Sequence, residues 1–340
     1  MTTTRRALVL GALTAATAVA FAVAVTVGTV AVPLRETVLV LLGLEPDDPR
    51  WSVVVETVRL PRAMTAALAG AALGVAGLQM QTLFRNPLAD PFSLGVSSGA
   101  SLGVSLAMVG TGGFAAGLAA GGRLGVVASA AVGGAVVLSG VLALARVVRT
   151  PVTLLVIGVM VGSATTALVS LLLTWTDPQR AQQYISWGLG SFSSTTLADL
   201  PVFGGVTAAG LAVAMLSAKP LNALLLGESY AKTMGLDVRR ARFVTLFSSS
   251  LLAGAVTAFC GPIGFLGIAV PHLARRLLGT SDHRVLLPGT LLAGALAALL
   301  CSVASQTPGG VVPVNVITSL VGAPVVIAIL LRARSLQGVG

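Results

Sequence analysis

Long apolar stretches separated by short polar breaks recur along the whole chain. A helix that crosses the hydrocarbon layer of a bilayer, roughly 30 Å thick, needs about 20 predominantly apolar residues. Stretches of this kind predict ten membrane helices, near 7–32, 62–84, 91–110, 121–145, 152–175, 197–217, 242–259, 263–279, 286–304 and 313–331. The pattern therefore predicts an all-α, polytopic membrane protein, with one transmembrane domain over residues 1–340.

The first apolar stretch, which follows Arg5 and Arg6, has two possible interpretations. A secretory signal peptide has an apolar core of about 7–15 residues. The run here, about 25 residues long, exceeds that length. We therefore expect a membrane helix at the N-terminus rather than a cleaved signal.

The composition agrees with a lipid environment. The 340 residues are 55% hydrophobic and only 9% charged, and the mean hydropathy is +0.96. A water-soluble domain carries about a quarter charged residues. The two cysteines, Cys260 and Cys301, stand alone on separate apolar segments, without a CxxC motif, so we expect core residues and no metal site.

The excess of basic over acidic residues, 21 against 11, follows the predicted topology. With a cytoplasmic N-terminus and ten crossings, most cations fall on the cytoplasmic side: Arg5, Arg6, Arg85, Arg146, Arg149, Lys219, Lys232, Arg239, Arg240, Arg242, Arg275, Arg276, Arg284, Arg332 and Arg334. The other side keeps Arg35, Arg50, Arg59, Arg62, Arg123 and Arg180. This distribution is the positive-inside pattern, which predicts cytoplasmic termini and argues against a nucleic-acid partner.

The longest predicted cytoplasmic loop, 218–241, contains NALLLGESYAKTMGLDVRR. Its apolar pieces are too short to span a membrane, and Gly227 and Gly235 interrupt them. Because glycine readily adopts the positive φ that a helix end needs, we expect two short helices with a glycine turn. Composition alone leaves open whether this segment is an interfacial helix or a docking element for a partner.

The chain lacks the sequence features of a built-in energy source. A phosphate-binding P-loop needs a lysine preceded by glycine, whereas Lys219 and Lys232 both follow alanine. All eleven acids are expected in loops or at helix ends, which disfavours a proton- or sodium-coupled carrier, since such carriers bury an acid in the bilayer. A transporter subunit driven by a separate motor fits best; a proton-coupled carrier and a structural scaffold remain as alternatives.

Six motifs in one order resemble the FecCD family of membrane permeases. They are RLPR (59–62), GLQMQTLFRNPLADP (77–91), LGVSSGA (94–100), LLLGESYAKTMGL (224–236), GPIGFLGIAVPHLARRLLGTSDHRVLLPG (261–289) and VITSLVGAPVVIAILLR (316–332). The resemblance covers about 51–332. The family supplies the permeases of ATP-driven importers for iron–siderophore complexes, haem and cobalamin.

The resemblance implies the fold and the partners of a type II importer permease in the bacterial cytoplasmic (inner) membrane. The expected partners are a second permease subunit, as a copy or a paralogue, two cytoplasmic ATPase subunits, and an extracytoplasmic substrate-binding protein. ATP and Mg would bind the ATPase, so we expect a chain that is not an enzyme and holds no cofactor of its own. An iron–siderophore or haem ligand is the first expectation; cobalamin stays open.

The resemblance also assigns the loop 218–241 as a coupling segment that inserts into a groove of the ATPase. The matching positions are Leu226, Gly227, Glu228, Ala231 and Gly235. Glu228 has an alternative, purely structural interpretation, because an acid at a helix start interacts favourably with the helix dipole.

The docking cations and the gate are assigned in the same way. By resemblance, Arg59 and Arg62 form an exposed rim that receives glutamates of the binding protein; interfacial anchoring is the alternative interpretation. Asn86 and Leu88, with Thr150 and Pro151, match the cytoplasmic gate.

The region SQTPGGVVP departs from the family pattern. Many relatives carry a third docking arginine and a glutamate there, near the places of Ser305 and Val311 in this chain. Either the third docking cation is missing or a different partner subunit supplies it, which weakens the docking assignment for this lobe. We expect a structural role for His272 and a solvent-side loop position for His283.

Overall fold

The computed structural model describes residues 3–109, 122–148, 150–307 and 310–337, and these residues form a largely helical bundle. A helix lies in each of the ten predicted ranges: α1 (Thr3–Thr26), α4 (Leu60–Leu83), α5 (Val96–Val109), α7 (Gly122–Val147), α8 (Pro151–Thr174), α10 (Leu200–Leu216), α13 (Val238–Cys260), α14 (Leu266–Leu278), α15 (His283–Ala304) and α16 (Val314–Gln337). The predicted helical fold class is confirmed.

Shorter elements join these helices. They are α2 (Leu34–Leu41), α3 (Arg50–Ser52), the π-helix η1 (Val53–Arg59), the 3₁₀ helices η2 (Pro91–Leu94) and η3 (Phe192–Ser194), α9 (Pro178–Gly188), α11 (Ala218–Leu225) and α12 (Glu228–Thr233). The strands β1 (Gln306–Thr307) and β2 (Gly310–Val311) form a small antiparallel hairpin, with Gln306 opposite Val311.

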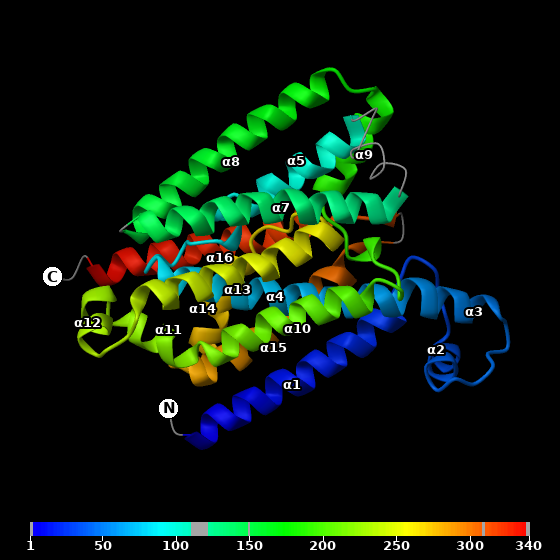
Figure 1. The fold of residues 1–340 in the computed structure, drawn as a ribbon. Helices are drawn as coiled ribbons and strands as arrows, with labels where there is room; N and C mark the ends of the chain where they lie inside the picture. The colour runs from blue at the N-terminus through cyan, green and yellow to red at the C-terminus, as the bar shows by residue number, and fades with distance from the viewer. Residues whose placement is uncertain (1–2, 110–121, 149, 308–309, 338–340) are drawn as a thin grey trace.

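The two chain ends lie at the same end of the bundle, together with α11 and α12, and α2 and α3 lie at the opposite end (Figure 1). We call the first the terminal end and the second the distal end. The order of the helices places the predicted cytoplasmic cations at the terminal end, although Arg149 lies outside the described residues.

Six described helices are long and apolar enough to cross a membrane: Thr4–Thr26, Arg50–Leu83, Leu124–Ala145, Val152–Thr174, Val238–Cys260 and His283–Ala304. The pair α10 and α11, bent by 54°, adds a seventh if it forms one span. Shorter apolar helices cover Val96–Val109 and Val314–Ala328. The chain thus has several spans by length and composition, and ten crossings remain a prediction.

The second long helix begins earlier than the sequence predicts. The expected loop 33–61 contains α2 and then a continuous helical run, Arg50–Leu83, in which the π-helix η1 leads directly into α4. Glu56 lies inside this run, so the expectation that every acid falls in a loop or at a helix end was wrong for this residue. Glu56 and Arg59 interrupt the apolar pattern and thereby conceal the helical extension.

Helix α4 lies in the core of the bundle and packs against α13, α14 and α15, with close backbone contacts to α14 and α15. A Cβ atom added at Gly70 would lie 2.1 Å from the carbonyl oxygen of Gly294 on α15, and one at Gly77 would lie 1.8 Å from that of Gly267 on α14. Small residues allow such approaches between membrane helices, where packing replaces the hydrophobic effect. These contacts fix α4 in the core.

A candidate coupling and gating site

Helices α11 and α12 form the predicted pair of short helices at the terminal end (Figure 1). Gly227, the residue before α12, has φ of 103° and ψ of 153°, and Gly235, which follows α12, has φ of 82°. L-residues rarely adopt such φ values, and the conformation of Gly227 is essentially restricted to glycine. The predicted glycine turn is confirmed.

This segment presents large apolar side chains to the surroundings. Leu226, Tyr230 and Met234 follow at intervals of four residues, and 59%, 65% and 63% of their surfaces are exposed. Ala231 is fully buried instead, in an apolar cluster with Leu224 and other residues. Leu226 is therefore available to a partner, whereas Ala231 packs α12 onto the bundle.

Glu228, the first residue of α12, forms an ion pair with Arg242 of α13. The Arg242 Nη2 donates to Glu228 Oε1 over 2.7 Å, and its Nη1 donates to the carbonyl oxygen of Val148 over 3.0 Å. Val148 directly follows α7 and precedes α8 by three residues. Arg242 thus joins α12 to the turn between α7 and α8.

The first predicted gate turn, between α4 and η2, is held by its own side chains. Asn86 Oδ1 accepts from the backbone nitrogen of Leu88 over 3.0 Å, and the Asn86 carbonyl oxygen accepts from Ala89 over 3.1 Å. Arg85, before the turn, has a positive φ of 48°. Asn86 therefore has the local turn-forming contacts, and Leu88 is exposed beside it.

Asp90 ends this turn and begins η2. Its Oδ1 accepts from the backbone nitrogen of Phe92 over 2.7 Å. Burial raises the pKa of the Asp90 carboxyl to about 6, from an ordinary value of 3.8, while the hydrogen bond from Phe92 acts in the opposite direction. The turn thus contains a carboxyl group whose ionisation is costly in the folded protein.

The second predicted gate turn begins α8. Thr150 is the N-cap residue, and its Oγ1 accepts from the backbone nitrogen of Thr153 over 3.2 Å. Pro151 is the first helical residue, a position at which no backbone hydrogen bond is lost. The hydrogen bonds of Asn86 and Thr150 are therefore local to their two turns, while η2 and α8 pack against each other.

A groove runs between α8 and the segment formed by η2 and α5. Its volume is about 590 Å³. Hydroxyl groups and glycines line much of it: Ser93, Ser98, Gly158, Gly162, Ser163, Thr166 and Ser170. The groove combines a small-residue wall with hydrogen-bonding groups.

The two histidines belong to different contacts. His272 Nε2 lies 2.9 Å from the carbonyl oxygen of Pro87, which ties α14 to the first gate turn and agrees with a structural role. The expectation for His283 was wrong, because its side chain is buried between Thr82 Oγ1, at 2.9 Å, and Asn222 Oδ1, at 2.8 Å. Those two partners lie on α4 and α11, distant in sequence, so hydropathy could not reveal them.

At the distal end, Arg59 and Arg62 do not form the exposed rim that the sequence predicts. Their surfaces are only 2% and 3% exposed. Arg59 donates to the carbonyl oxygens of Val25, Thr26 and Val30. The carbonyl oxygens of Ala24 and Val27 accept from Arg62 Nη2 over 2.9 and 2.7 Å. The two cations therefore bind the C-terminal end of α1, which lacks intrahelical donors; a docking role for them stays a prediction.

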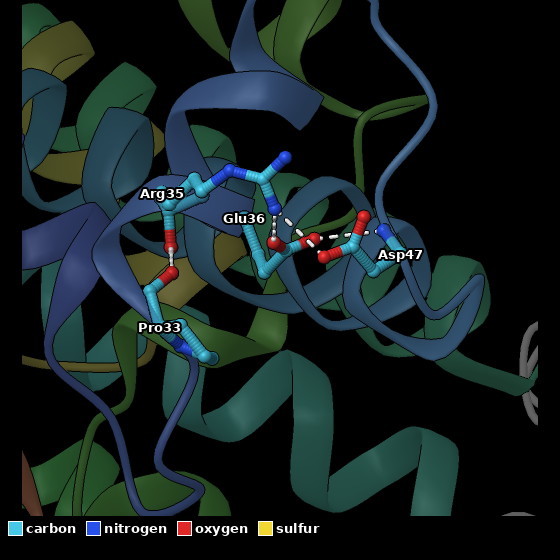
Figure 2. A network of polar contacts seen from close by, with 5 residues as sticks. Pro33, Arg35, Glu36 and Asp47 are labelled. Atoms are coloured by element: carbon cyan, nitrogen blue, oxygen red, sulfur yellow. Dashed lines mark hydrogen bonds and ion pairs between the residues drawn. The ribbon is translucent and has the colours of Figure 1, made fainter.

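Part of the exposed charge at this end lies on the segment around α2. Figure 2 shows Arg35 Nη1 directed at Glu36 Oε1, 2.9 Å away, and at Asp47 Oδ2, 2.7 Å away. The second oxygen of Glu36 accepts from the Asp47 backbone nitrogen over 2.8 Å. Arg35 is mostly exposed and Glu36 is buried. The network joins Asp47 to the start of α2 and so holds together the two ends of the segment that precedes Arg50–Leu83.

The region of the missing third docking cation forms the small hairpin. Ser305 is buried just before β1, and Val311 on β2 is exposed. A cavity of about 240 Å³ lies beside them and is also lined by Arg62 and Ser302. The uncharged Ser305 and Val311 therefore lie where the resemblance implies a third docking arginine and a glutamate.

Comparisons with known proteins agree with this architecture. A solved inward-facing conformation of an ABC transporter assigned to the metal-chelate type superposes with a TM-score of 0.82 and 28% identity, over 95% of this chain and 98% of that chain. The hemin transport system permease protein HmuU of Yersinia pestis is 35% identical over 297 residues, 86% of this chain and 87% of the relative. The vitamin B12 import system permease protein BtuC of Escherichia coli is 36% identical over 310 residues, 86% and 88% of the two chains.

The model of the FecCD transport family matches residues 16–332, which is most of the chain. The relatives that match over more than four fifths of this chain are permease subunits. From the family match, the helical fold and the relatives together, it follows that this multi-pass membrane protein belongs to the FecCD transport family of ABC transporter permeases.

Proposed function

We propose that this chain forms the translocation pathway of an ATP-driven importer for iron complexes, a siderophore or haem, in the bacterial cytoplasmic (inner) membrane. The terminal end faces the cytoplasm, because most Lys and Arg residues gather there. Import proceeds by alternating access: the permease exposes the pathway first to the outside and then to the cytoplasm. ATP hydrolysis belongs to a separate subunit.

The observation that carries this proposal is the two-sided character of α11 and α12. Leu226, Tyr230 and Met234 of this segment are exposed, whereas Ala231 and Glu228 tie the segment to the bundle. Exposed apolar side chains at the polar end of a membrane protein favour a protein partner. We infer that two ATPase subunits dock here, one on each permease.

Helix α8 supports the presence of a second permease subunit, a copy or a paralogue. Large apolar side chains outside the groove are exposed along it: Val152, Val156, Met160, Leu168 and Leu171 are all at least 48% exposed. Its other side borders the hydroxyl-lined groove of about 590 Å³. Two such helices from two subunits would enclose a pathway with small, weakly binding walls between them.

The distal end is the proposed docking surface for the extracytoplasmic binding protein. Arg35 and Arg50 offer exposed guanidinium groups there, each next to an acid of this chain. Arg59 and Arg62 support this surface from below by fixing the end of α1 to α4. A partner with acidic lobes would be steered by such a surface.

The cargo class rests on the relatives. The hemin permease of Yersinia pestis and the metal-chelate type transporter support an iron complex. Cobalamin is the second candidate, because the vitamin B12 permease of Escherichia coli is about equally similar. The family membership is common to both.

The test is uptake by proteoliposomes that contain this permease, its ATPase and its binding protein. Labelled haem, a ferric siderophore and cobalamin are supplied outside, with ATP in the compartment that holds the ATPase. We expect ATP-dependent accumulation of an iron complex. Accumulation of cobalamin alone would replace the cargo, and accumulation that needs a proton gradient but no ATP would overturn the mechanism.

A further inference from the structure

Two chemically different contacts of one buried guanidinium join the proposed ATPase-docking segment to a proposed gate turn. Arg242 lies near the start of α13, and its side chain is 6% exposed. One of its nitrogens binds the carboxylate of Glu228 on α12, and another binds the carbonyl oxygen of Val148, between α7 and α8. In the sequence, Arg242 is one of many predicted cytoplasmic cations.

We propose that Arg242 is a positioning residue for transport: it carries a displacement of α12 to the turn that begins α8, so that the gate follows the ATPase. This proposal rests on the proposed function. In the transport cycle, Arg242 would keep α12 and the turn at a fixed distance while both move relative to the rest of the bundle.

The chemistry of arginine suits this task. The guanidinium group is planar and rigid, and its donors point in fixed directions, so two acceptors held by it keep a fixed relative position. The Glu228 carboxylate is only 25% exposed, and charge-assisted hydrogen bonds in such sites are stronger than neutral ones. A lysine ammonium would keep the charge but would not hold two acceptors in fixed directions.

An apolar cluster beneath the ion pair supports the same connection. It contains Leu224 of α11 and Ala231 of α12 together with Val141 of α7 and Leu154 of α8. These four side chains are at most 3% exposed. Close-packed cores transmit displacement rather than absorb it, so α12 and the start of α8 share a common base.

The other gate turn approaches the same junction. A Cβ atom added at Gly227 would lie 3.4 Å from Nη1 of Arg85, the residue that precedes Asn86. The start of α12 therefore lies beside the first gate turn and is bonded through Arg242 to the second. One short helix is in position to act on both turns.

The first experiment compares Arg242→Met with Arg242→Lys in the reconstituted transporter that contains the ATPase and the binding protein. Methionine removes both contacts and keeps an apolar stem of similar length, whereas lysine keeps the charge. We expect Arg242→Met to retain ATPase binding and ATP hydrolysis while uptake per ATP hydrolysed falls by about tenfold or more. Arg242→Lys should lie between Arg242→Met and the native protein.

Arg239→Met is the matched control, because Arg239 is an exposed cation of the same helical turn. We expect its uptake per ATP to equal that of the native chain. The proposal is overturned if Arg242→Met keeps native uptake per ATP, or if uptake and hydrolysis fall in the same proportion, as they would for a merely misfolded subunit.

The charge exchange Glu228→Arg with Arg242→Glu separates the ion pair from the connection to the turn. It restores opposite charges, but a glutamate at 242 has no donor for the carbonyl oxygen of Val148. We therefore expect the exchanged protein to retain ATPase binding and ATP hydrolysis and to remain uncoupled in transport. Full recovery of uptake per ATP in the exchanged protein would contradict the proposal.

A distance measurement keeps the proposal testable if a variant fails to fold. Spin labels at Ser229→Cys and Val147→Cys, both exposed positions, report the distance from α12 to the end of α7 in an otherwise native transporter. We expect this distance to stay constant when ATP binds, while the distance from Ser229→Cys to a label at Leu216→Cys changes. If the first distance changes as much as the second, Arg242 does not connect the two elements.

Failure of the proposed ATP-driven import would give a different result from failure of the role of Arg242. In that case the native transporter itself would show no ATP-driven uptake, and ATPase binding to α11 and α12 would be absent. A native transporter that works, with Arg242→Met unimpaired, would reject the role of Arg242 alone.

Discussion

Arg62 of α4 lies against the last turns of α1, where its Nη2 donates a 2.9 Å hydrogen bond to the carbonyl oxygen of Ala24. The last carbonyl groups of a helix have no intrahelical donors, and a cation there also interacts favourably with the helix dipole. Arg59 serves the same helix end through Val25, Thr26 and Val30. The arginines of the RLPR motif therefore join the first two long helices.

Replacing Arg62 should destabilise the fold itself. Arg62→Gln keeps a donor but removes the charge and shortens the side chain, which leaves carbonyl groups of α1 without their partner. We expect a loss of about 2–5 kcal/mol in the free energy of unfolding, measured by thermal or denaturant unfolding in detergent. Arg50→Gln is the control, because Arg50 is an exposed cation of the same end, and its midpoint should hardly change. Equal midpoints for the two variants would contradict the buried role of Arg62.

The glycine contacts of α4 make a second prediction. Gly77→Ala should prevent the normal approach of α14, because the new Cβ would lie 1.8 Å from the carbonyl oxygen of Gly267. Backbone atoms on both sides cannot rotate away, so we expect a destabilisation of about 1–3 kcal/mol, or loss of folded protein in the membrane. Gly140→Ala on α7 has nothing within 4 Å of its new Cβ and should not destabilise the protein, because alanine favours a helix more than glycine does. Folded yield and thermal midpoint measure both variants, and a neutral Gly77→Ala would refute the close packing of these helices.

A third prediction concerns the start of α12. Gly227 has φ of 103° and ψ of 153°, a region almost restricted to glycine, so Gly227→Ala should strain this junction by about 1–3 kcal/mol. Because the junction lies between the proposed ATPase surface and the gate turns, we expect hydrolysis to continue with less uptake per ATP. Gly205→Ala, in a helix with open space around it, is the control. If both variants keep the native uptake per ATP hydrolysed, the backbone conformation of Gly227 has no role in transport.

The pH dependence of Asp90 makes a fourth prediction. Burial raises the pKa of the Asp90 carboxyl to about 6, above its ordinary value of 3.8. A pKa that is higher in the folded state means that the protonated carboxyl favours folding fully below about pH 4, and that this contribution is lost as the pH rises through about 6. Asp90→Asn keeps an acceptor for the Phe92 nitrogen and has no charge to bury. Its thermal midpoint should match the native one near pH 4 and exceed it above pH 6; parallel curves across this range would contradict the buried carboxyl.

The helices and the glycine turns were predictable because their signals are local. Apolar runs placed a helix in each of the ten ranges, and Gly227 and Gly235 marked the ends of α12, since an isolated run or glycine carries its own structural preference. The resemblance to known permeases also assigned a coupling role to the segment 218–241; the comparisons show the family, and that role stays a prediction.

The contacts of charged and polar side chains were not predictable in the same way. Their hydrogen-bond partners are distant in the sequence. Arg62 and Ala24 are 38 residues apart, His283 and Thr82 are 201 apart, and Arg242 and Val148 are 94 apart. Hydropathy ranks such residues as polar and places them at surfaces, whereas a backbone carbonyl supplied by a distant helix lets them be buried. An arginine near the start of a long helix, fourteen residues after a glutamate, gave no sign of its second partner.

The most direct measurement is transport by purified protein in sealed vesicles, with and without the ATPase subunit. The permease alone, with cargo and binding protein present, should not accumulate cargo against a concentration gradient. Addition of the ATPase and ATP should produce accumulation that stops when hydrolysis is inhibited. Uphill accumulation by the permease alone would contradict the account, because this chain would then contain its own energy source.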